Sequence, residues 1–249
     1  MLATLIDLLN GLPLNFPVIQ APMAGGATTT DLIVAACEAG ALGFIAGAYR
    51  SAEQIERQAG EIRSRTERPF GVNLFAPVSV PAAPADADAA LQFLAAYHER
   101  LGLPSPRLGT GFEEEFEARV LAALESGASV LSFTFGVMPD WVLDAARERG
   151  LRLVGTATNV EEALALERSG VDAIVAQGSE AGGHRGTFAG EFEDSLIGTV
   201  ALVPQLVDAV SVPVIASGGI ADGRGIAAAI TLGAVAVQLG TAFLTAAES

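Results

Sequence analysis

The sequence contains no lysine, because all 14 of its basic residues are arginine. Without a lysine amine, Schiff-base catalysis and lysine-anchored pyridoxal phosphate are excluded. The single cysteine, Cys37, excludes an intrachain disulfide, and its apolar helical surroundings favour core packing over a thiolate nucleophile. Histidine is nearly as scarce, with His98 in a charged helical pattern and His184 in a glycine-rich loop. Any imidazole chemistry therefore falls on one of two residues.

Positive charge is also in short supply. The chain carries 29 acidic residues against 14 basic ones, a formal net charge of -15 and a pI near 4.4. Nucleic acid and anionic membrane surfaces would be repelled, so neither is expected as a partner. An anionic ligand would have to be held by local backbone dipoles.

Targeting signals are absent from the sequence pattern. Residues 1–15 carry no basic residue before their apolar stretch, which is wrong for a signal peptide, so we expect a cytoplasmic protein. Residues 225–247 are uncharged, but Gly233 and Gly240 interrupt the run and residues 234–239 are strand-like. This pattern argues against a membrane span.

Strand-like and helix-like segments alternate along the chain, as in a parallel sheet with helical crossovers. Eight strands are predicted, over residues 17–22, 41–46, 70–75, 129–135, 151–155, 171–176, 213–216 and 234–239. The count predicts a single-domain α/β fold over residues 1–249, a TIM-type (β/α)₈ barrel, with a doubly wound open sheet as the alternative.

Two features depart from a regular barrel. The proline-rich stretch 78–111 is predicted to be an inserted excursion, either a lid or a surface decoration. The sequence also stops a few residues past the eighth predicted strand, which leaves no room for an eighth helix. We expect either a shortened chain or a partner that covers this flank.

Polar groups gather in the loop that follows the sixth predicted strand. Residues 177–186 read Gln-Gly-Ser-Glu-Ala-Gly-Gly-His-Arg-Gly, and they directly follow a buried apolar run. Glycines on both sides let the backbone approach something flat or bulky. We therefore place the chemistry at His184.

An anion site is predicted after the seventh and eighth strands, where barrels usually seat a phosphate. The loops there contain Ser217-Gly218-Gly219 and Gly240-Thr241, whose backbone N–H groups and following helix starts can bind an anion without lysine. Residues 223–225 imitate the start of a dinucleotide fingerprint, but they do not follow a strand directly. Tight turns between well-packed elements are the structural alternative.

Other strand ends add amide, hydroxyl and sulfur groups at the same mouth of the barrel. These groups belong to Gln20, Met23, Asn73, Thr156, Thr158 and Gln177. Amides can hydrogen-bond the edge of a heterocycle, and methionine can lie against a ring face. Together they suit FMN, a flat cofactor with a polar edge and a phosphate tail.

Several of these motifs together resemble the nitronate monooxygenase family, formerly called 2-nitropropane dioxygenases. They are the segments 18–26 (VIQAPMAGG), 71–73 (GVN), 177–186 (QGSEAGGHRG), 216–225 (ASGGIADGRG) and 238–241 (QLGT). The resemblance implies an FMN-binding TIM-type barrel that oxidises alkyl nitronates, and in some members neutral nitroalkanes, with dioxygen. It implies that His184 is the catalytic histidine and that no metal is needed. The implied cofactor contacts are Gln20, Ala21, Pro22, Met23, Asn73, Gln177, Gly182, Gly183, Ser217, Gly218, Gly219, Gly240 and Thr241.

The sequence departs from the family pattern in two places. Members normally continue well past the eighth strand, and some carry a basic residue where this chain has Gly155-Thr156. The first departure affects the expected activity, and the second affects only the tuning of the flavin.

Two other functions are weighed against nitronate oxidation. Flavin-dependent enoyl-acyl-carrier-protein reductases resemble residues 180–184, but they tend to carry a carboxylate where Gln177 stands. A non-catalytic flavin- or phosphate-binding barrel is the alternative from a different class. The substrate and any homo-oligomer formation are left open by the sequence.

Overall fold

Eight parallel strands form one sheet in the computed structural model, which describes residues 11–77, 86–107 and 112–249. The strand order is β1-β8-β7-β6-β5-β4-β3-β2, and a bridge between Ile19 and Leu42 brings β1 beside β2. The strands are β1 (Val18–Gln20), β2 (Gly43–Ala46), β3 (Phe70–Phe75), β4 (Val130–Thr134), β5 (Arg152–Ala157), β6 (Ala173–Gln177), β7 (Val214–Ser217) and β8 (Ala236–Leu239). The predicted (β/α)₈ barrel is confirmed, and the open doubly wound alternative is wrong.

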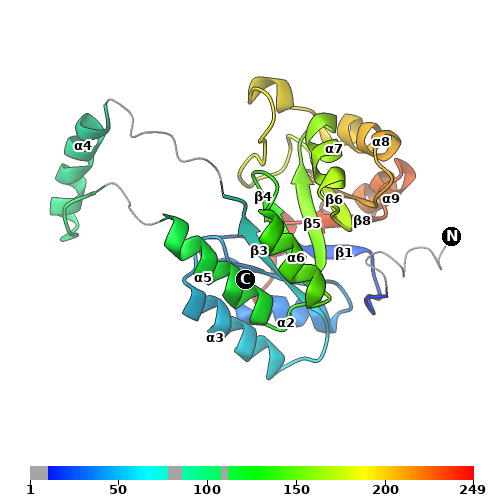
Figure 1. Ribbon diagram of the computed structural model, residues 1–249, viewed down its shortest axis with the longest axis horizontal. Coiled ribbons are helices and arrows are strands. Elements are labelled where there is room, and N and C mark those ends of the chain that lie inside the picture. The colour runs from blue at the N-terminus through cyan, green and yellow to red at the C-terminus, as the bar shows by residue number, and fades with distance from the viewer. Residues whose placement is uncertain (1–10, 78–85, 108–111) are drawn as a thin grey trace.

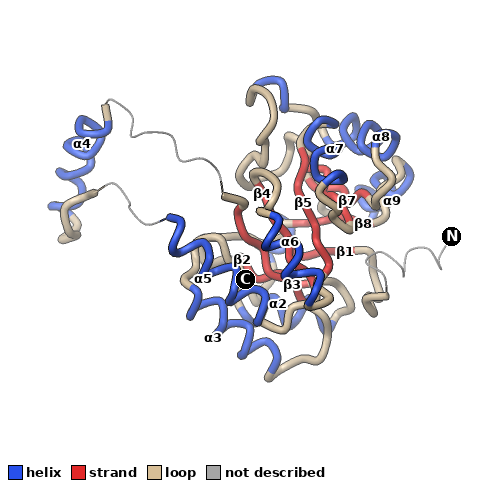
Figure 2. Tube along the Cα trace, in the orientation of Figure 1, coloured by secondary structure: helices blue, strands red, loops and turns tan. Residues whose placement is uncertain are grey.

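Helices surround the sheet, except α4, which lies apart from it (Figures 1 and 2). They are α2 (Thr30–Glu38), α3 (Ala52–Arg63), α4 (Ala87–Arg100), α5 (Phe112–Glu125), α6 (Asp140–Glu148), α7 (Val160–Arg168), α8 (Thr199–Ala209) and α9 (Gly223–Thr231), with 3₁₀ turns η1 (Glu193–Ser195) and η2 (Thr241–Thr245). The predicted start of α3 at Ser51 is confirmed, because the Ser51 hydroxyl accepts from Gln54 N–H in a capping box.

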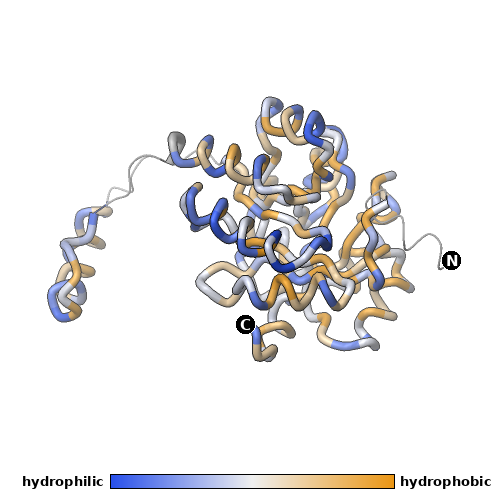
Figure 3. Tube along the Cα trace, turned by 90° about the horizontal axis from the view of Figure 1, so that it is seen from below, coloured by the Kyte–Doolittle hydropathy of each residue, from blue (hydrophilic) through white to orange (hydrophobic). Residues whose placement is uncertain are grey.

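The strands separate two hydrophobic clusters. The smaller cluster takes Ile19, Phe44, Val175 and Ile215 from strands around the sheet and fills the barrel. The larger one lies between the strands and the helices. Along the helices hydrophobic and hydrophilic residues alternate, as expected of helices with one face on a core (Figure 3). Gly71 makes room for Phe44, because a Cβ at position 71 would lie 2.2 Å from the Phe44 ring.

Cys37 belongs to this core, as the sequence predicts. Its side chain is buried in α2, and its Sγ donates to the Pro69 carbonyl oxygen at 3.3 Å. Burial raises the pKa of the thiol to about 11. Such a thiol is not a ready nucleophile at neutral pH.

The uncharged run 225–247 is divided between α9, β8 and η2. Among residues 11–77, 86–107 and 112–249, no helix is long and apolar enough to cross a membrane. Of the predicted excursion, residues 78–85 and 108–111 lie outside the described residues. The part between them contains α4, none of whose side chains is buried.

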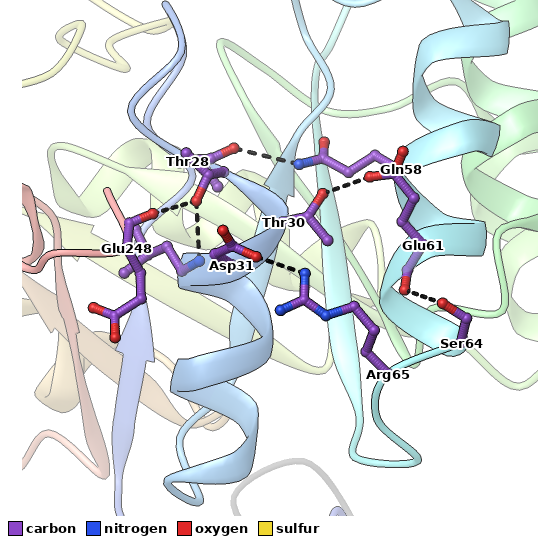
Figure 4. A network of polar contacts seen from close by, with 10 residues as sticks. Thr28, Thr30, Asp31, Gln58, Glu61, Ser64, Arg65 and Glu248 are labelled. Carbon is purple, nitrogen blue, oxygen red and sulfur yellow. Dashed lines mark hydrogen bonds and ion pairs between the residues drawn. The ribbon is translucent and has the colours of Figure 1, made fainter.

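Polar contacts fasten the loop between β1 and α2, which borders the candidate site. The Thr28 hydroxyl accepts from Met23 N–H at 2.8 Å, and this contact orders the chain just after β1. Figure 4 shows the surrounding contacts, which join Thr28 to Gln58, Thr30 to Glu61, Asp31 to Arg65, and Glu248 to the start of α2.

Candidate active site

A cavity of about 1030 Å³ opens at the carboxyl ends of the strands. Each strand, or the residues directly after it, contributes to the wall. The contributors include Ala21, Ala46, Asn73, Ser132, Thr156, Gln177, Ser217 and Gln238. Parallel strands in a barrel bring their carboxyl ends to one mouth, which is where barrel enzymes build their active sites.

The cavity lining contains His184 and all but one of the residues that the family resemblance implies as cofactor contacts. These residues are Ala21, Pro22, Met23, Asn73, Gln177, Gly182, Gly183, His184, Ser217, Gly218, Gly219, Gly240 and Thr241. The catalytic loop and the predicted anion loops therefore face the same space. Gly178 N–H donates to the Ser217 carbonyl oxygen at 2.8 Å, and Thr241 lies beside Gly182, because a Cβ at position 182 would lie 3.0 Å from the Thr241 Oγ1.

Gln20 is the exception. It is fully buried, its Oε1 accepts from Phe44 N–H at 3.1 Å, and its Nε2 donates to the Ala21 carbonyl oxygen. The side chain ties β1 to β2, and the structure does not bring it to the cavity. Thr158 is likewise withdrawn, because its hydroxyl donates to Glu162 Oε2 at 2.7 Å, whereas Thr156 lines the cavity as expected.

The Gln177 side chain organises the loop that carries His184. Its Nε2 donates to the His184 carbonyl oxygen at 2.8 Å, and its Oε1 accepts from Gly186 N–H at 2.8 Å. Gly186 is required at this contact, since a Cβ there would lie 2.9 Å from the Thr134 methyl group. Gln177 thus fixes the backbone that directly follows the imidazole, from the His184 carbonyl to the Gly186 N–H, a role the sequence did not indicate.

Arg185 holds the same loop in place through hydrogen bonds to backbone oxygens. Its guanidinium donates to the carbonyl oxygens of Gln177 and Ser195. Burial lowers the pKa of this guanidinium, while the nearby charges of Glu162 and Glu180 act in the opposite direction. An arginine in this setting stays charged and works as a multivalent donor to backbone oxygens.

Three aromatic rings lie close to the His184 imidazole, which remains exposed. The ring centroids of Phe75, Phe135 and Tyr49 lie 5.9, 6.0 and 6.1 Å from the centroid of the imidazole. Phe135 has a φ of 74°, which is uncommon for a bulky residue and costs conformational energy. Backbone strain of this kind concentrates at functional sites.

The predicted anion site is bordered by backbone amides of two loops. No recorded hydrogen bond between described residues uses the backbone N–H groups of Gly218, Gly219, Gly240 or Thr241. Unpaired amides at a cavity are the donors that a phosphate needs. The start of α9 contributes less than the sequence predicted, because Asp222 already accepts from the N–H groups of Arg224 and Gly225.

Gly218 has no room for a side chain. Its φ is 119°, and a Cβ would lie 2.8 Å from the Thr199 hydroxyl. The sharp turn lets the backbone of this loop border the cavity. Strand register supports the arrangement, since Gln177, Ser217 and Gln238 are paired neighbours on β6, β7 and β8.

Glu180 contacts the start of α8. Both carboxylate oxygens accept from Thr199 N–H, at 2.8 and 3.1 Å, and Oε2 also accepts from the Thr199 hydroxyl at 2.8 Å. Burial raises the pKa of this carboxyl, but the Thr199 hydrogen bonds and the charge of Arg185 outweigh it, so the pKa is lowered from 4.5. The carboxylate therefore caps a helix instead of exchanging protons at neutral pH.

Replacing Glu180 by glutamine (Glu180→Gln) should lower the free energy of unfolding at pH 7 by about 1 kcal/mol. The folded pKa is depressed, so the stabilisation is present above the ordinary value of 4.5 and is lost as the pH falls through the lower folded value. Denaturant unfolding at pH 7 and pH 3 measures this difference. Glu193→Gln, in the same loop, is the matched control, and an equal loss for both variants, or a difference that does not shrink between pH 7 and pH 3, would contradict the capping role.

Two polar groups on β4 complete the wall. Ser132 Oγ accepts from Asn73 Nδ2 at 2.9 Å, and Ser132 and Thr134 both line the cavity. Sequence reasoning missed this pair, although their spacing of two residues in a strand places them on one face. Within residues 11–77, 86–107 and 112–249, no group of three or more His, Cys, Asp or Glu side chains could hold a metal ion.

The fold and the cavity define a TIM barrel with a large cavity at the carboxyl ends of its strands, the place where barrel enzymes build their active sites. A sequence profile of the nitronate monooxygenase family matches residues 7–249. The chain belongs to this family of flavin-dependent oxidoreductases, so the predicted resemblance is confirmed.

Known relatives agree with this assignment. A probable nitronate monooxygenase from Staphylococcus saprophyticus is 42% identical over 240 residues, and the match covers 96% of this chain and 67% of that protein. A nitroalkane oxidase structure from Streptomyces ansochromogenes has a TM-score of 0.86 at 40% identity, covering 96% of this chain and 67% of that one. FabK from Thermotoga maritima has a TM-score of 0.72 at 32% identity, covering 99% and 63%. The chain thus spans about two thirds of the length of these relatives.

Proposed function

We propose that this chain binds FMN and oxidises alkyl nitronates, and neutral nitroalkanes, with dioxygen to give carbonyl compounds and nitrite. One observation carries the proposal: His184 and the unpaired amides of residues 218–219 and 240–241 line the same cavity. The family assignment and the nitroalkane oxidase neighbour support the substrate class.

The residues of the cavity fit FMN. Its volume of about 1030 Å³ is ample for a nucleotide-sized ligand. The phosphate would be held by the N–H groups at Gly218, Gly219, Gly240 and Thr241, for which no partner is found among the described residues. The flavin ring would lie among Met23, the amide of Asn73 and the small residues of the wall, which are Ala21, Pro22, Gly182, Gly183 and Ser217. When bound, FMN supplies the redox chemistry between the organic substrate and dioxygen.

For a neutral nitroalkane, His184 acts as a base. An unprotonated ring nitrogen takes the proton from the carbon next to the nitro group. The C–H bond breaks, and its electron pair passes into the nitro group to give the nitronate. The hydrogen bonds of Gln177 to the backbone of His184 and Gly186 keep the imidazole at the cavity during this step.

For a preformed nitronate, the proton has already left and His184 positions the anion through a ring N–H. This contact matters because the chain as a whole carries a net charge of -15, which disfavours an anionic substrate. The local donors of the cavity must offset that repulsion.

The proposal is tested by the absorbance spectrum of the purified chain, followed by oxygen uptake with propionate 3-nitronate and 2-nitropropane. We expect an oxidised flavin spectrum and nitrite formation in proportion to oxygen consumed. A chain that binds no flavin, or a flavin-loaded chain that consumes no oxygen with either compound, would overturn the proposal.

The reductase alternative is tested in the same preparation. Rapid reduction of the flavin by NADH or NADPH, coupled to turnover of an enoyl thioester, would favour an enoyl-acyl-carrier-protein reductase. Flavin binding without turnover of any of these substrates would favour a non-catalytic barrel.

A further inference from the structure

Tyr49 contacts His184 from the loop between β2 and α3. Its hydroxyl oxygen lies 3.1 Å from His184 Nε2, within hydrogen-bonding distance. The loop itself is tied down, because Gly47 N–H donates to the Asn73 carbonyl oxygen and Arg50 N–H donates to the Gly47 carbonyl oxygen. The phenol is therefore presented to the imidazole by an ordered turn.

Packing alone does not account for Tyr49 in this place. The residue is 61% exposed, so its ring adds little to the core. It meets Phe75 edge to face at a centroid distance of 5.5 Å, and Phe75 meets Phe135 in the same way at 4.8 Å. These contacts orient the phenol, and its hydroxyl is directed to the His184 ring.

We propose that Tyr49 is a positioning residue for His184, whose hydroxyl engages Nε2 and leaves Nδ1 as the nitrogen that meets the substrate. The substrate part of this inference rests on the function proposed above. A base needs a free lone pair, so Nε2–H donates to the Tyr49 oxygen and Nδ1 remains unprotonated.

This arrangement favours proton removal from a nitroalkane. When Nδ1 takes the proton, the C–H bond breaks, its electron pair enters the nitronate, and the imidazolium keeps its Nε2–H bond to Tyr49. Hydrogen bonds to charged groups are stronger than those between neutral groups, so the phenol stabilises the protonated ring more than the neutral one. A preformed nitronate needs no such step and should depend less on Tyr49.

The test compares two substrates in one variant. Tyr49→Phe keeps the ring and its contacts but removes the hydroxyl. We expect kcat/KM for 2-nitropropane to fall about 10-fold or more, and kcat/KM for propionate 3-nitronate to fall less than about 3-fold. Tyr97→Phe is the matched control, since Tyr97 is the other tyrosine and contacts Phe93 within α4, at a ring-centroid distance of 5.3 Å. This substitution should leave both values unchanged.

A second measurement does not depend on turnover. With ¹⁵N-labelled histidine the chain gives ring signals from two residues, and His98→Asn assigns those of His184. In the unmodified chain at a pH where the ring is neutral, Nε2 should resonate as the N–H nitrogen and Nδ1 as the unprotonated one. In Tyr49→Phe the two signals should move towards each other as both tautomers become populated.

Identical His184 signals in the unmodified chain and in Tyr49→Phe would overturn the inference, and so would equal losses on both substrates. A change in the His184 signals in a chain that oxidises neither compound would support the contact with Tyr49 and overturn the proposed function instead. A failure of the Tyr49 inference can thus be distinguished from a failure of the proposed function.

Discussion

Replacing His184 by asparagine (His184→Asn) is expected to lower kcat/KM for 2-nitropropane by about 10² to 10⁴, the usual range for loss of a general base. The asparagine keeps the backbone carbonyl that accepts from Gln177, so the loop should stay in place. Propionate 3-nitronate is already the conjugate base of its nitroalkane and needs no deprotonation, so its turnover should fall by about 10-fold or less. Steady-state oxygen uptake with both compounds, in flavin-replete protein, measures the difference.

His98→Asn is the control for this substitution. His98 lies at the end of α4 and contacts the Pro104 carbonyl oxygen, away from the cavity lining. Both substrates should be oxidised at unchanged rates. Unchanged turnover of 2-nitropropane by His184→Asn would remove His184 from the role of base.

Replacing Thr241 by aspartate (Thr241→Asp) is expected to weaken FMN binding by about 100-fold or more. The new carboxylate would stand where the phosphate is proposed to bind, and two like charges about 4 Å apart repel by about 4 kcal/mol near a protein surface. Riboflavin lacks the phosphate and should lose much less affinity. Fluorescence titration with both flavins separates repulsion of the phosphate from damage to the ring site.

The control lies one turn further along η2. Thr245→Asp adds the same charge at an exposed position outside the cavity lining, and it should leave both affinities nearly unchanged. Equal weakening of FMN and riboflavin by Thr241→Asp would show that the phosphate does not bind beside residues 240–241.

The sequence predicted the architecture because local patterns determine it. Eight apolar runs separated by helical patterns are enough to indicate the barrel, and parallel strands necessarily carry their carboxyl-end residues to one mouth. For that reason the sequence alone assigns residues that are far apart in the chain to one site, among them Asn73, Gln177, Ser217 and Thr241.

Side-chain partners depend on the fold in a way that local patterns do not show. The Gln20 side chain accepts a hydrogen bond from the main chain of β2, at Phe44 N–H. The position of Gln20 at the end of a predicted strand does not indicate this partner. Glu180 caps a helix that begins 19 residues later. The Tyr49 contact spans 135 residues of sequence. The positive φ of Phe135 arises from tertiary packing, because no glycine or asparagine marks it.

A crystal structure of the chain grown with FMN tests the central claim most directly. The account predicts a phosphate within hydrogen-bonding distance of the N–H groups at residues 218–219 and 240–241, and a flavin ring in the cavity beside the His184 imidazole. A phosphate bound elsewhere, or a flavin ring out of reach of His184, would contradict it.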